Sequence, residues 1–431
     1  MKASTIPVDS VGSMRWMICT MLFVATTINF MDRQVIGVLA PLLQSKIGWS
    51  DLQYSYIIGG FQFAYAIGLV LAGWIVDKIG TRYGYAIVIG VWSLAAMSHS
   101  LATGVLGFAL ARIFLGFGES GNFPCAIKTT AEWFPQKERS FATGIFNSGS
   151  SVGPILAPLL CPFIALRYGW QAAFLTTGIF SVTWMVLWLI YYRPPAKFPR
   201  ISKEEYNYIH SDREVAVATL PWKDLFGYRQ TWAFAVGKFL TDPIWWFYLF
   251  WLPSFLYQRF HLGLSRLGWP LVIIYSASVV GSVGGGWLPQ LLNRGGMPMN
   301  KARLRVMFIC ACLALPIFFV CNTNSERTAV ALLSLAIAAH QGWSANLFTT
   351  PSDMFPQAAV GSVTGIGGTG GSLGGVIFSM AVGWVLHLTH SYSLIFAISA
   401  SAYLVALASI CVLAPGLHKA EIRLQDLPVI S

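Results

Sequence analysis

Apolar side chains fill windows of about twenty residues along nearly the whole chain, and short polar stretches separate these windows. A helix of about twenty apolar residues crosses the roughly 30 Å hydrocarbon core of a bilayer. The pattern predicts about twelve spanning helices, near 15–43, 52–76, 83–103, 105–131, 140–164, 170–192, 232–257, 267–292, 302–321, 327–349, 360–387 and 391–413. We therefore expect an all-α membrane protein.

The longest polar stretch lies between the sixth and seventh predicted spans and runs from Arg193 to Arg229. It begins with PPAKFPR and continues with SKEEYNYIHSDREV, a charged segment of helical composition. We interpret this stretch as a connector. The predicted domains are a six-helix bundle at 1–192, a cytoplasmic connector at 193–229 and a second six-helix bundle at 230–431.

A direct repeat supports two similar halves. FPQKERSFATGIFNSGSSVG, from Phe134, aligns without gaps at an offset of 221 residues with FPQAAVGSVTGIGGTGGSLG, from Phe355. Each copy lies between the fourth and fifth spans of its half, so the halves form parallel repeats. This construction suits alternating access, in which two bundles rock against each other around a midplane site. The glycines of the repeat can serve close helix contact or a hinge, and both roles stay open at this point.

Composition excludes a soluble globular protein. Hydrophobic residues make up 55% of the chain and charged residues 10%, against roughly 25% charged in an average soluble protein. The net charge of +11 therefore concerns orientation rather than nucleic acid, which is not an expected partner. With the N-terminus inside, the inner segments hold 19 Lys and Arg and the outer loops five. We expect a multi-pass membrane protein with both termini cytoplasmic.

Several motifs of soluble enzymes occur without the context that they need. The seven cysteines form no CxxC pair, so we expect neither a metal nor a disulfide. GxSxG at Gly149 and GxGxxG at Gly365 lie in predicted spanning helices, without the preceding strand that either motif requires. We expect no enzymatic activity and no cofactor.

Four ionisable residues interrupt apolar windows: Asp32 and Arg33 in the first span, and Arg112 and Glu119 in the fourth. A charge at the bilayer centre costs about 2.5–3.5 kcal/mol on insertion scales, so each needs a partner, a wet cavity or a function. Arg112 and Glu119 share a helix face about 10 Å apart along the axis. We expect them to face the first span across one cavity.

These residue types divide the chemistry of anion transport between them. The guanidinium groups of Arg33 and Arg112 are permanently charged forks that fit a carboxylate. Asp32 and Glu119 can gain and lose protons, and an anion that competes for an arginine favours protonation of its carboxylate partner. The alternative is that the four residues form two static ion pairs between helices.

The loop GWIVDKIGTR resembles the signature loop between the second and third helices of the major facilitator superfamily. The matching positions are Gly73, Asp77, Lys78, Gly80 and Arg82. The resemblance implies that this loop acts as a gating latch. The equivalent loop of the second half, LPQLLNRGGMPMNKAR, lacks the acidic residue.

NFMDRQVIGVLAP, ARIFLGFGESGNFP and EWFPQKERSFATGIFNSGSSVG are similar to the anion:cation symporter family and, within it, to bacterial hexuronate and hexonate carriers. The resemblance implies a proton-coupling role for Asp32 and Glu119 and an anion-binding role for Arg33 and Arg112. It also implies that Asn147 contacts the substrate.

Other polar and aromatic side chains within the predicted spans are candidates to complete a sugar-acid site. They are Gln62, Tyr65, Trp245, Tyr275, His340, Asn346 and Ser372. Two pairs spaced by four residues, Lys238 with Asp242 and Lys128 with Glu132, are predicted to form ion pairs within a helix.

The predicted function is proton-coupled uptake of an organic acid anion, a hexuronate such as galacturonate or glucuronate, by a monomeric carrier. A hexonate, an aldarate and an aromatic carboxylate are alternative substrates. A membrane sensor that binds the solute without moving it is an alternative of another class.

Overall fold

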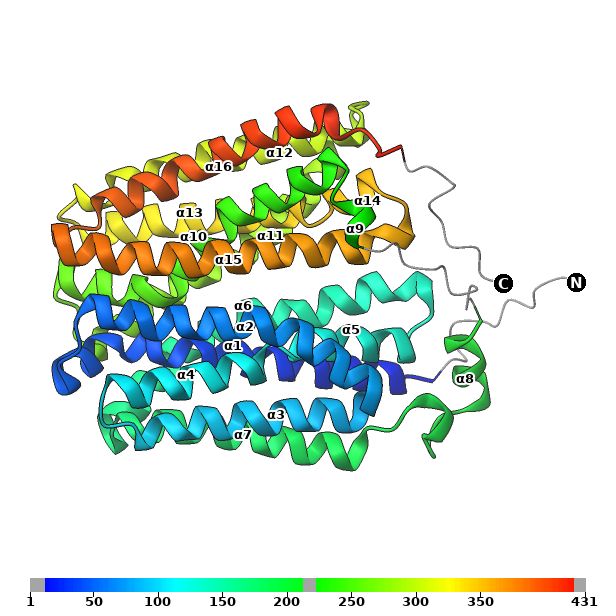
Figure 1. Cartoon of the computed structure of the whole chain (residues 1–431), viewed down its shortest axis with the longest axis horizontal. Helices are drawn as coiled ribbons and strands as arrows, with labels where there is room; N and C mark the ends of the chain where they lie inside the picture. The colour runs from blue at the N-terminus through cyan, green and yellow to red at the C-terminus, as the bar shows by residue number, and fades with distance from the viewer. Residues whose placement is uncertain (1–11, 212–221, 422–431) are drawn as a thin grey trace, which may run out of the picture. The chain divides into compact units, whose positions relative to one another are not determined.

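The computed structural model describes residues 12–211 and 222–421, and helices are the only regular secondary structure in these ranges (Figure 1). Eight of the described helices are long and apolar enough to cross a bilayer. A ninth candidate is formed by Asp51–Leu69 and Leu71–Ile79, which meet at an angle of 41°. The expectation of an all-α membrane protein is confirmed.

The first half of the chain contains seven long helices: α1 (Met14–Ile47), α2 (Asp51–Ile79), α3 (Thr81–Ser98), α4 (Val105–Glu119), α5 (Asn122–Trp133), α6 (Gln136–Tyr168) and α7 (Trp170–Tyr191). The second half contains six: α10 (Arg229–Phe260), α11 (Leu264–Arg294), α12 (Met299–Ala314), α13 (Glu326–Leu347), α15 (Gln357–Thr389) and α16 (Ser393–Leu413). The short helices are α8 (Lys203–Ile209), α9 (Trp222–Leu225) and α14 (Thr350–Met354).

The sequence repeat produces two equivalent helices, α6 and α15. Each follows a proline N-cap, Pro135 or Pro356, and each contains 33 residues. Their first residues, 136 and 357, and their last residues, 168 and 389, are both separated by 221 positions. The offset found in the sequence therefore extends over the whole helix in each half.

Glycines of the repeat hold each of these helices against a neighbour. A Cβ on Gly153 of α6 would lie 2.6 Å from the carbonyl oxygen of Thr27 in α1. At the equivalent position of α15, a Cβ on Gly374 would collide with the carbonyl oxygen of Phe239 in α10. Close helix contact accounts for both glycines, as in other membrane bundles. A hinge role for the repeat stays a prediction.

The fourth predicted span, 105–131, is interrupted, which the sequence analysis did not anticipate. α4 ends at Glu119 and α5 begins at Asn122. Glycine is a poor helix former. Gly118, next to the end of α4, permits close contact with α3. A Cβ on Gly118 would lie 2.6 Å from the backbone nitrogen of Trp92. The interruption makes Glu119 the last residue of α4.

The described residues divide into two compact units. The first unit contains the residues up to Ile36 and those from Phe63 through α8. The second unit contains Gly37–Gln62 together with α9 to α16. Within the second unit, the segment Gly37–Gln62 packs on α10, where the Tyr54 hydroxyl donates to the carbonyl oxygen of Phe250 at 2.9 Å.

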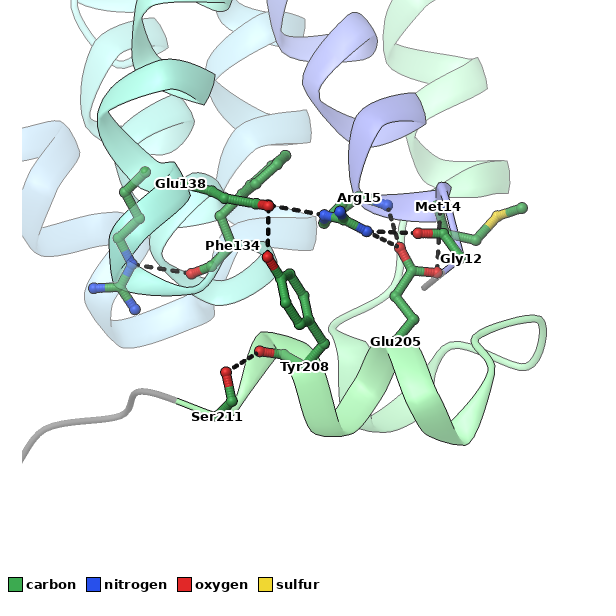
Figure 2. A network of polar contacts seen from close by, with 9 residues as sticks. Gly12, Met14, Arg15, Phe134, Glu138, Glu205, Tyr208 and Ser211 are labelled. Atoms are coloured by element: carbon green, nitrogen blue, oxygen red, sulfur yellow. Dashed lines mark hydrogen bonds and ion pairs between the residues drawn. The ribbon is translucent and has the colours of Figure 1, made fainter. Parts of the chain in front are cut away.

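Helix α8 of the connector is held against α1 and α6 of the first unit (Figure 2). The Glu205 carboxylate accepts hydrogen bonds from the backbone N–H groups of Met14 (3.3 Å) and Arg15 (3.0 Å), and so caps the first turn of α1. The Arg15 side chain forms an ion pair with Glu138 at 2.9 Å and with Glu205 at 3.4 Å. Tyr208 completes the cluster by donating to Glu138 at 2.7 Å. We call these four side chains, Arg15, Glu138, Glu205 and Tyr208, the connector cluster.

Candidate functional site

The four ionisable residues singled out in the sequence come together inside the first unit. Asp32 and Arg33 lie on α1, and Arg112 and Glu119 lie on α4. Each of the four is at most 2% exposed. Burying charged groups requires compensation by partners, so the contacts among them determine what the cluster can do.

Arg33 occupies the gap between Arg112 and Glu119. Its Nε lies 2.8 Å from the Glu119 Oε2 atom, and its backbone carbonyl oxygen accepts a hydrogen bond of 2.8 Å from Arg112 Nη2. Its Nη2 donates to the Asn29 Oδ1 atom at 3.3 Å. One residue of α1 thus contacts both charged residues of α4, Glu119 through its side chain and Arg112 through its backbone carbonyl oxygen.

The Arg33 guanidinium also lies between two aromatic rings. Its centre is 4.5 Å from the Phe30 ring and 4.8 Å from the Tyr65 ring. An arginine stacked on aromatic faces is held in a fixed plane, which prepares it for bidentate binding of a carboxylate. Tyr65, a predicted substrate contact, therefore lies beside the guanidinium that would hold an anion.

Asp32 faces a different helix from its sequence neighbour. Its Oδ2 atom accepts a hydrogen bond of 2.7 Å from the Ser181 hydroxyl of α7. Ser181 could not be identified from the sequence, because α7 carries several Ser and Thr residues and no periodic signal distinguishes this one. Asn29 was also missed, although it lies one helical turn before Arg33 and could have been found by that spacing.

Both carboxyl groups retain one unsatisfied oxygen. Asp32 Oδ1 and Glu119 Oε1 are buried and have no hydrogen-bond partner among the residues that the structure describes. An unsatisfied buried acceptor is uncommon and calls for an explanation. Protonation would lower the cost of burying such a group, because it removes the negative charge of the carboxylate.

The remaining predicted substrate contacts fall into two groups. Three of them already have structural hydrogen bonds. Tyr275 donates to the Tyr248 carbonyl oxygen at 2.9 Å, the Asn346 amide donates to Gly285 and Gly342, each at 2.8 Å, and His340 Nδ1 lies 2.8 Å from the Tyr403 hydroxyl. The others are Gln62, Trp245 and Ser372 in the second unit, of which only Trp245 is not buried, and Asn147, which is exposed on α6.

The segment that resembles a gating latch comprises the end of α2, a sharp turn at Gly80 and the start of α3. Gly80 has a φ angle of 85°, a conformation that favours glycine, and precedes the first residue of α3. Arg82 donates to the Leu189 carbonyl oxygen of α7 at 2.6 Å, and the Lys78 ammonium lies 5.0 Å from the Trp74 ring. A Cβ on Gly73 would meet no atom within 4 Å.

One predicted ion pair is wrong and the other is confirmed. Lys128 binds Asp77 of α2 at 2.7 Å instead of Glu132. Glu132 accepts hydrogen bonds from the hydroxyls of Thr81 and Tyr192, so packing against α3 and α7 turns its carboxylate away from Lys128. In α10, Lys238 and Asp242 form the expected pair at 2.6 Å.

The profile of the Major Facilitator Superfamily matches residues 22–379, which is most of the chain. The chain belongs to the Major Facilitator Superfamily. Its relatives include the hexuronate transporter of Escherichia coli (strain K12), which is 31% identical over 396 residues, or 90% of this chain and 91% of the relative. The galacturonate transporter of Dickeya chrysanthemi is 34% identical over 290 residues, or 66% of this chain and 84% of the relative.

The fold of this superfamily member is also found in solved structures. The crystal structure of a D-xylose-proton symporter aligns with a TM-score of 0.73 at 16% identity, covering 93% of this chain and 98% of that chain. At that identity the likeness shows the fold alone. The superfamily and the relatives identify the protein as a multi-pass membrane transporter of a small molecule, and not as an enzyme.

Proposed function

We propose that this major facilitator protein takes up a hexuronate, such as galacturonate or glucuronate, together with protons by alternating access. The names of the relatives support a sugar acid as the substrate. The observation that carries the proposal is the buried ion pair between Arg33 and Glu119, with Arg112 on the Arg33 carbonyl and Asp32 beside it.

The ion pair provides a physical link between anion binding and proton binding. A substrate carboxylate that binds Arg33 competes with Glu119 for the same guanidinium. A buried carboxylate that loses its counter-charge is costly, and it avoids the cost by taking a proton. Release of the substrate reverses the exchange, and Glu119 gives up its proton when it binds Arg33 again.

Arg112 and Asp32 have distinct parts in this proposal. Arg112 holds the backbone of Arg33 and adds a second positive charge to the site where the anion binds. Asp32, supported by Ser181, is a second group that can carry a proton. One proton per monoanion makes transport electroneutral. A second proton gives the transported set a net positive charge, so the membrane potential also drives uptake, by about 2.3 kcal/mol per charge at 100 mV.

The remaining assignments rest on the sequence. We propose that eight further residues contact the substrate: Gln62, Tyr65, Asn147, Trp245, Tyr275, His340, Asn346 and Ser372. We propose that the loop Gly73–Arg82 takes part in gating. The bundles are assigned to 1–192 and 230–431 with a connector between them, in a bacterial inner membrane with both termini cytoplasmic.

Uptake by purified protein in proteoliposomes tests the proposal. We expect labelled galacturonate or glucuronate to accumulate when the outside is more acidic than the lumen, and a protonophore to abolish the accumulation. Counterflow of labelled substrate, without a proton gradient, separates a carrier from a sensor. Accumulation that a protonophore leaves unchanged would contradict proton coupling, and the absence of uptake for every sugar acid tested would contradict the substrate class.

A further inference from the structure

Helix α10 of the second unit carries a buried ion pair that the proposed mechanism does not use. Lys238 Nζ lies 2.6 Å from Asp242 Oδ2, one turn apart in a helix that is otherwise largely apolar. Replacing a buried ion pair by apolar residues is often neutral or stabilising, so stability alone is a weak reason for this pair. An ionisable residue within a membrane helix is by default a candidate for a substrate or ion site.

The two members of the pair are not equally enclosed. The Lys238 side chain is 5% exposed, and its ammonium lies 3.7 Å from the centre of the Phe348 ring. The Asp242 side chain is 21% exposed. Lys238 therefore holds the Asp242 carboxylate in place and neutralises its charge from the more buried side. The Asp242 carboxylate is the member of the pair that can accept further hydrogen bonds.

Two glycines of α15 let side chains on neighbouring helices pack directly on the α15 backbone. A Cβ on Gly371 would collide with Asp242 Oδ2. Gly375, one turn further and about 6 Å along the helix, faces the Trp246 ring and the Gln62 side chain, whose Nε2 would lie 3.5 Å from a Cβ. Bare α15 backbone thus lies beside both Asp242 and Gln62.

Gln62 is the second unusual polar group at this place. The residue is 1% exposed, and neither its amide oxygen nor its amide nitrogen has a hydrogen-bond partner among the described residues. A buried donor or acceptor without a partner costs about 1–3 kcal/mol. An amide that needs both a donor and an acceptor is complemented by a hydroxyl group, which is both at once.

Aromatic packing on the same helix makes the surroundings of Asp242 rigid. Trp245, three residues after Asp242, stacks on His340 with ring centroids 5.5 Å apart and an interplanar angle of 4°. His340 is fixed in turn through its Nδ1 atom, which lies 2.8 Å from the Tyr403 hydroxyl. A flat, fixed indole next to hydrogen-bonding groups is suited to the apolar face of a sugar ring.

We propose that Asp242, positioned by Lys238, and Gln62 form a subsite for the hydroxyl groups of the substrate. An ionised carboxylate accepts hydrogen bonds and donates none, so it binds vicinal hydroxyls, whereas a second carboxylate at the same place would offer it no donor. The subsite therefore selects polyhydroxylated monocarboxylates over aldarates and over acids without hydroxyls. This inference rests on the proposed sugar-acid transport and narrows the substrate class.

Competition against labelled galacturonate in counterflow tests the subsite. The competitors are unlabelled galacturonate, its dicarboxylate counterpart galactarate, and tetrahydropyran-2-carboxylate, which keeps the ring and the acid without hydroxyls. For the unaltered protein we expect galacturonate to compete at least about tenfold more strongly than either of the others, the ratio that one charge-assisted hydrogen bond provides. Equal competition by all three would overturn the subsite and leave anion transport intact, whereas no counterflow at all would contradict the proposed function itself.

Variants then assign the selectivity to these residues. We expect Asp242→Asn and Gln62→Leu each to weaken galacturonate competition about tenfold or more, with tetrahydropyran-2-carboxylate little changed. Because Asp242→Asn leaves a buried ammonium without its counter-ion and can fail to fold, the double variant Lys238→Met/Asp242→Leu serves as a second version. Asp353→Asn, which breaks the Arg303–Asp353 ion pair elsewhere in the second unit, is the matched control and should keep the selectivity. Retention of that selectivity by folded subsite variants would overturn the assignment.

Discussion

At the scale of single residues, Arg33 is the group on which the first-unit cluster depends. Its side chain binds Glu119 and Asn29, and its carbonyl oxygen accepts from Arg112. Lysine could not replace it, because one ammonium cannot offer the planar set of donors that serves Glu119, Asn29 and an entering carboxylate. Glu119 is consequently the carboxylate that an anionic substrate must displace.

The Glu119→Gln variant tests this displacement. Glutamine keeps the shape of the side chain but has no group that gains or loses a proton near pH 7, so transport is uncoupled from the proton gradient. We expect gradient-driven accumulation to fall by at least about tenfold while counterflow stays within about threefold of the unaltered protein. Both are measured in the same proteoliposomes with labelled hexuronate.

Glu132→Gln is the control for that experiment. Glu132 is also a carboxylate of the α4–α5 segment, but it accepts hydrogen bonds from Thr81 and Tyr192 and does not bind Arg33. The Glu132→Gln variant should keep gradient-driven accumulation and counterflow in the same ratio as the unaltered protein. Equal loss of accumulation and counterflow in Glu119→Gln would assign Glu119 to binding or folding instead of proton coupling.

At the scale of helices, the packing of α6 and α15 against their neighbours depends on their glycines as much as on their apolar residues. The equivalent positions Gly153 and Gly374 both place a helix directly on the backbone of a neighbour, α1 or α10. Since van der Waals packing is a main source of association between helices in a bilayer, loss of this contact should reduce stability directly. α1 carries Asp32 and Arg33, so its position against α6 also affects the candidate site.

Gly153→Ala measures the contribution of that contact. The added methyl group would meet the Thr27 carbonyl oxygen, and we expect the free energy of unfolding to fall by about 1–3 kcal/mol, as for other overpacked sites. Thermal unfolding of the purified protein in detergent provides the measurement. Gly144→Ala on the same helix is the control, because a Cβ there meets nothing within 4 Å and alanine is the better helix former. Equal stability of the two variants would mean that close contact at Gly153 is unimportant.

At the scale of the whole molecule, the connector is attached to the first unit by specific charged contacts. Arg15 is 4% exposed and binds both Glu138 and Glu205, so the end of α1, the start of α6 and α8 are tied at one point (Figure 2). Partial burial and the hydrogen bond to Glu138 both raise the pKa of Tyr208. Its hydroxyl therefore stays protonated and remains a donor over the neutral pH range.

Glu205→Ala removes the cap of α1 and one partner of Arg15 together. We expect the free energy of unfolding to fall by about 2 kcal/mol, which combines the loss of an N-terminal cap with that of a charge-assisted hydrogen bond. The measurement is the thermal unfolding midpoint, with Glu204→Ala as the control because Glu204 is the exposed neighbour on the same helix. A Glu205→Ala midpoint no lower than that of Glu204→Ala would show that the connector cluster adds nothing to stability.

Several features of this protein could be predicted from its sequence because they depend on local composition or on repetition. Apolar windows predicted the all-α membrane class, and the 221-residue offset predicted the equivalence of α6 and α15. The cost of charge in a bilayer drew attention to Asp32, Arg33, Arg112 and Glu119 without any structure. The loop from Gly73 to Arg82 indicated the superfamily.

The partners of these residues were decided only by tertiary structure. Lys128 and Glu132 have the spacing of an ion pair, yet packing against α2, α3 and α7 gave each a different partner. Of several similar residues on α7, Ser181 is the one that the packing of α7 against α1 brings to Asp32. Sequence spacing fixes which residues share a face of one helix, but the rotation and contact of neighbouring helices determine which side chain of another helix that face meets.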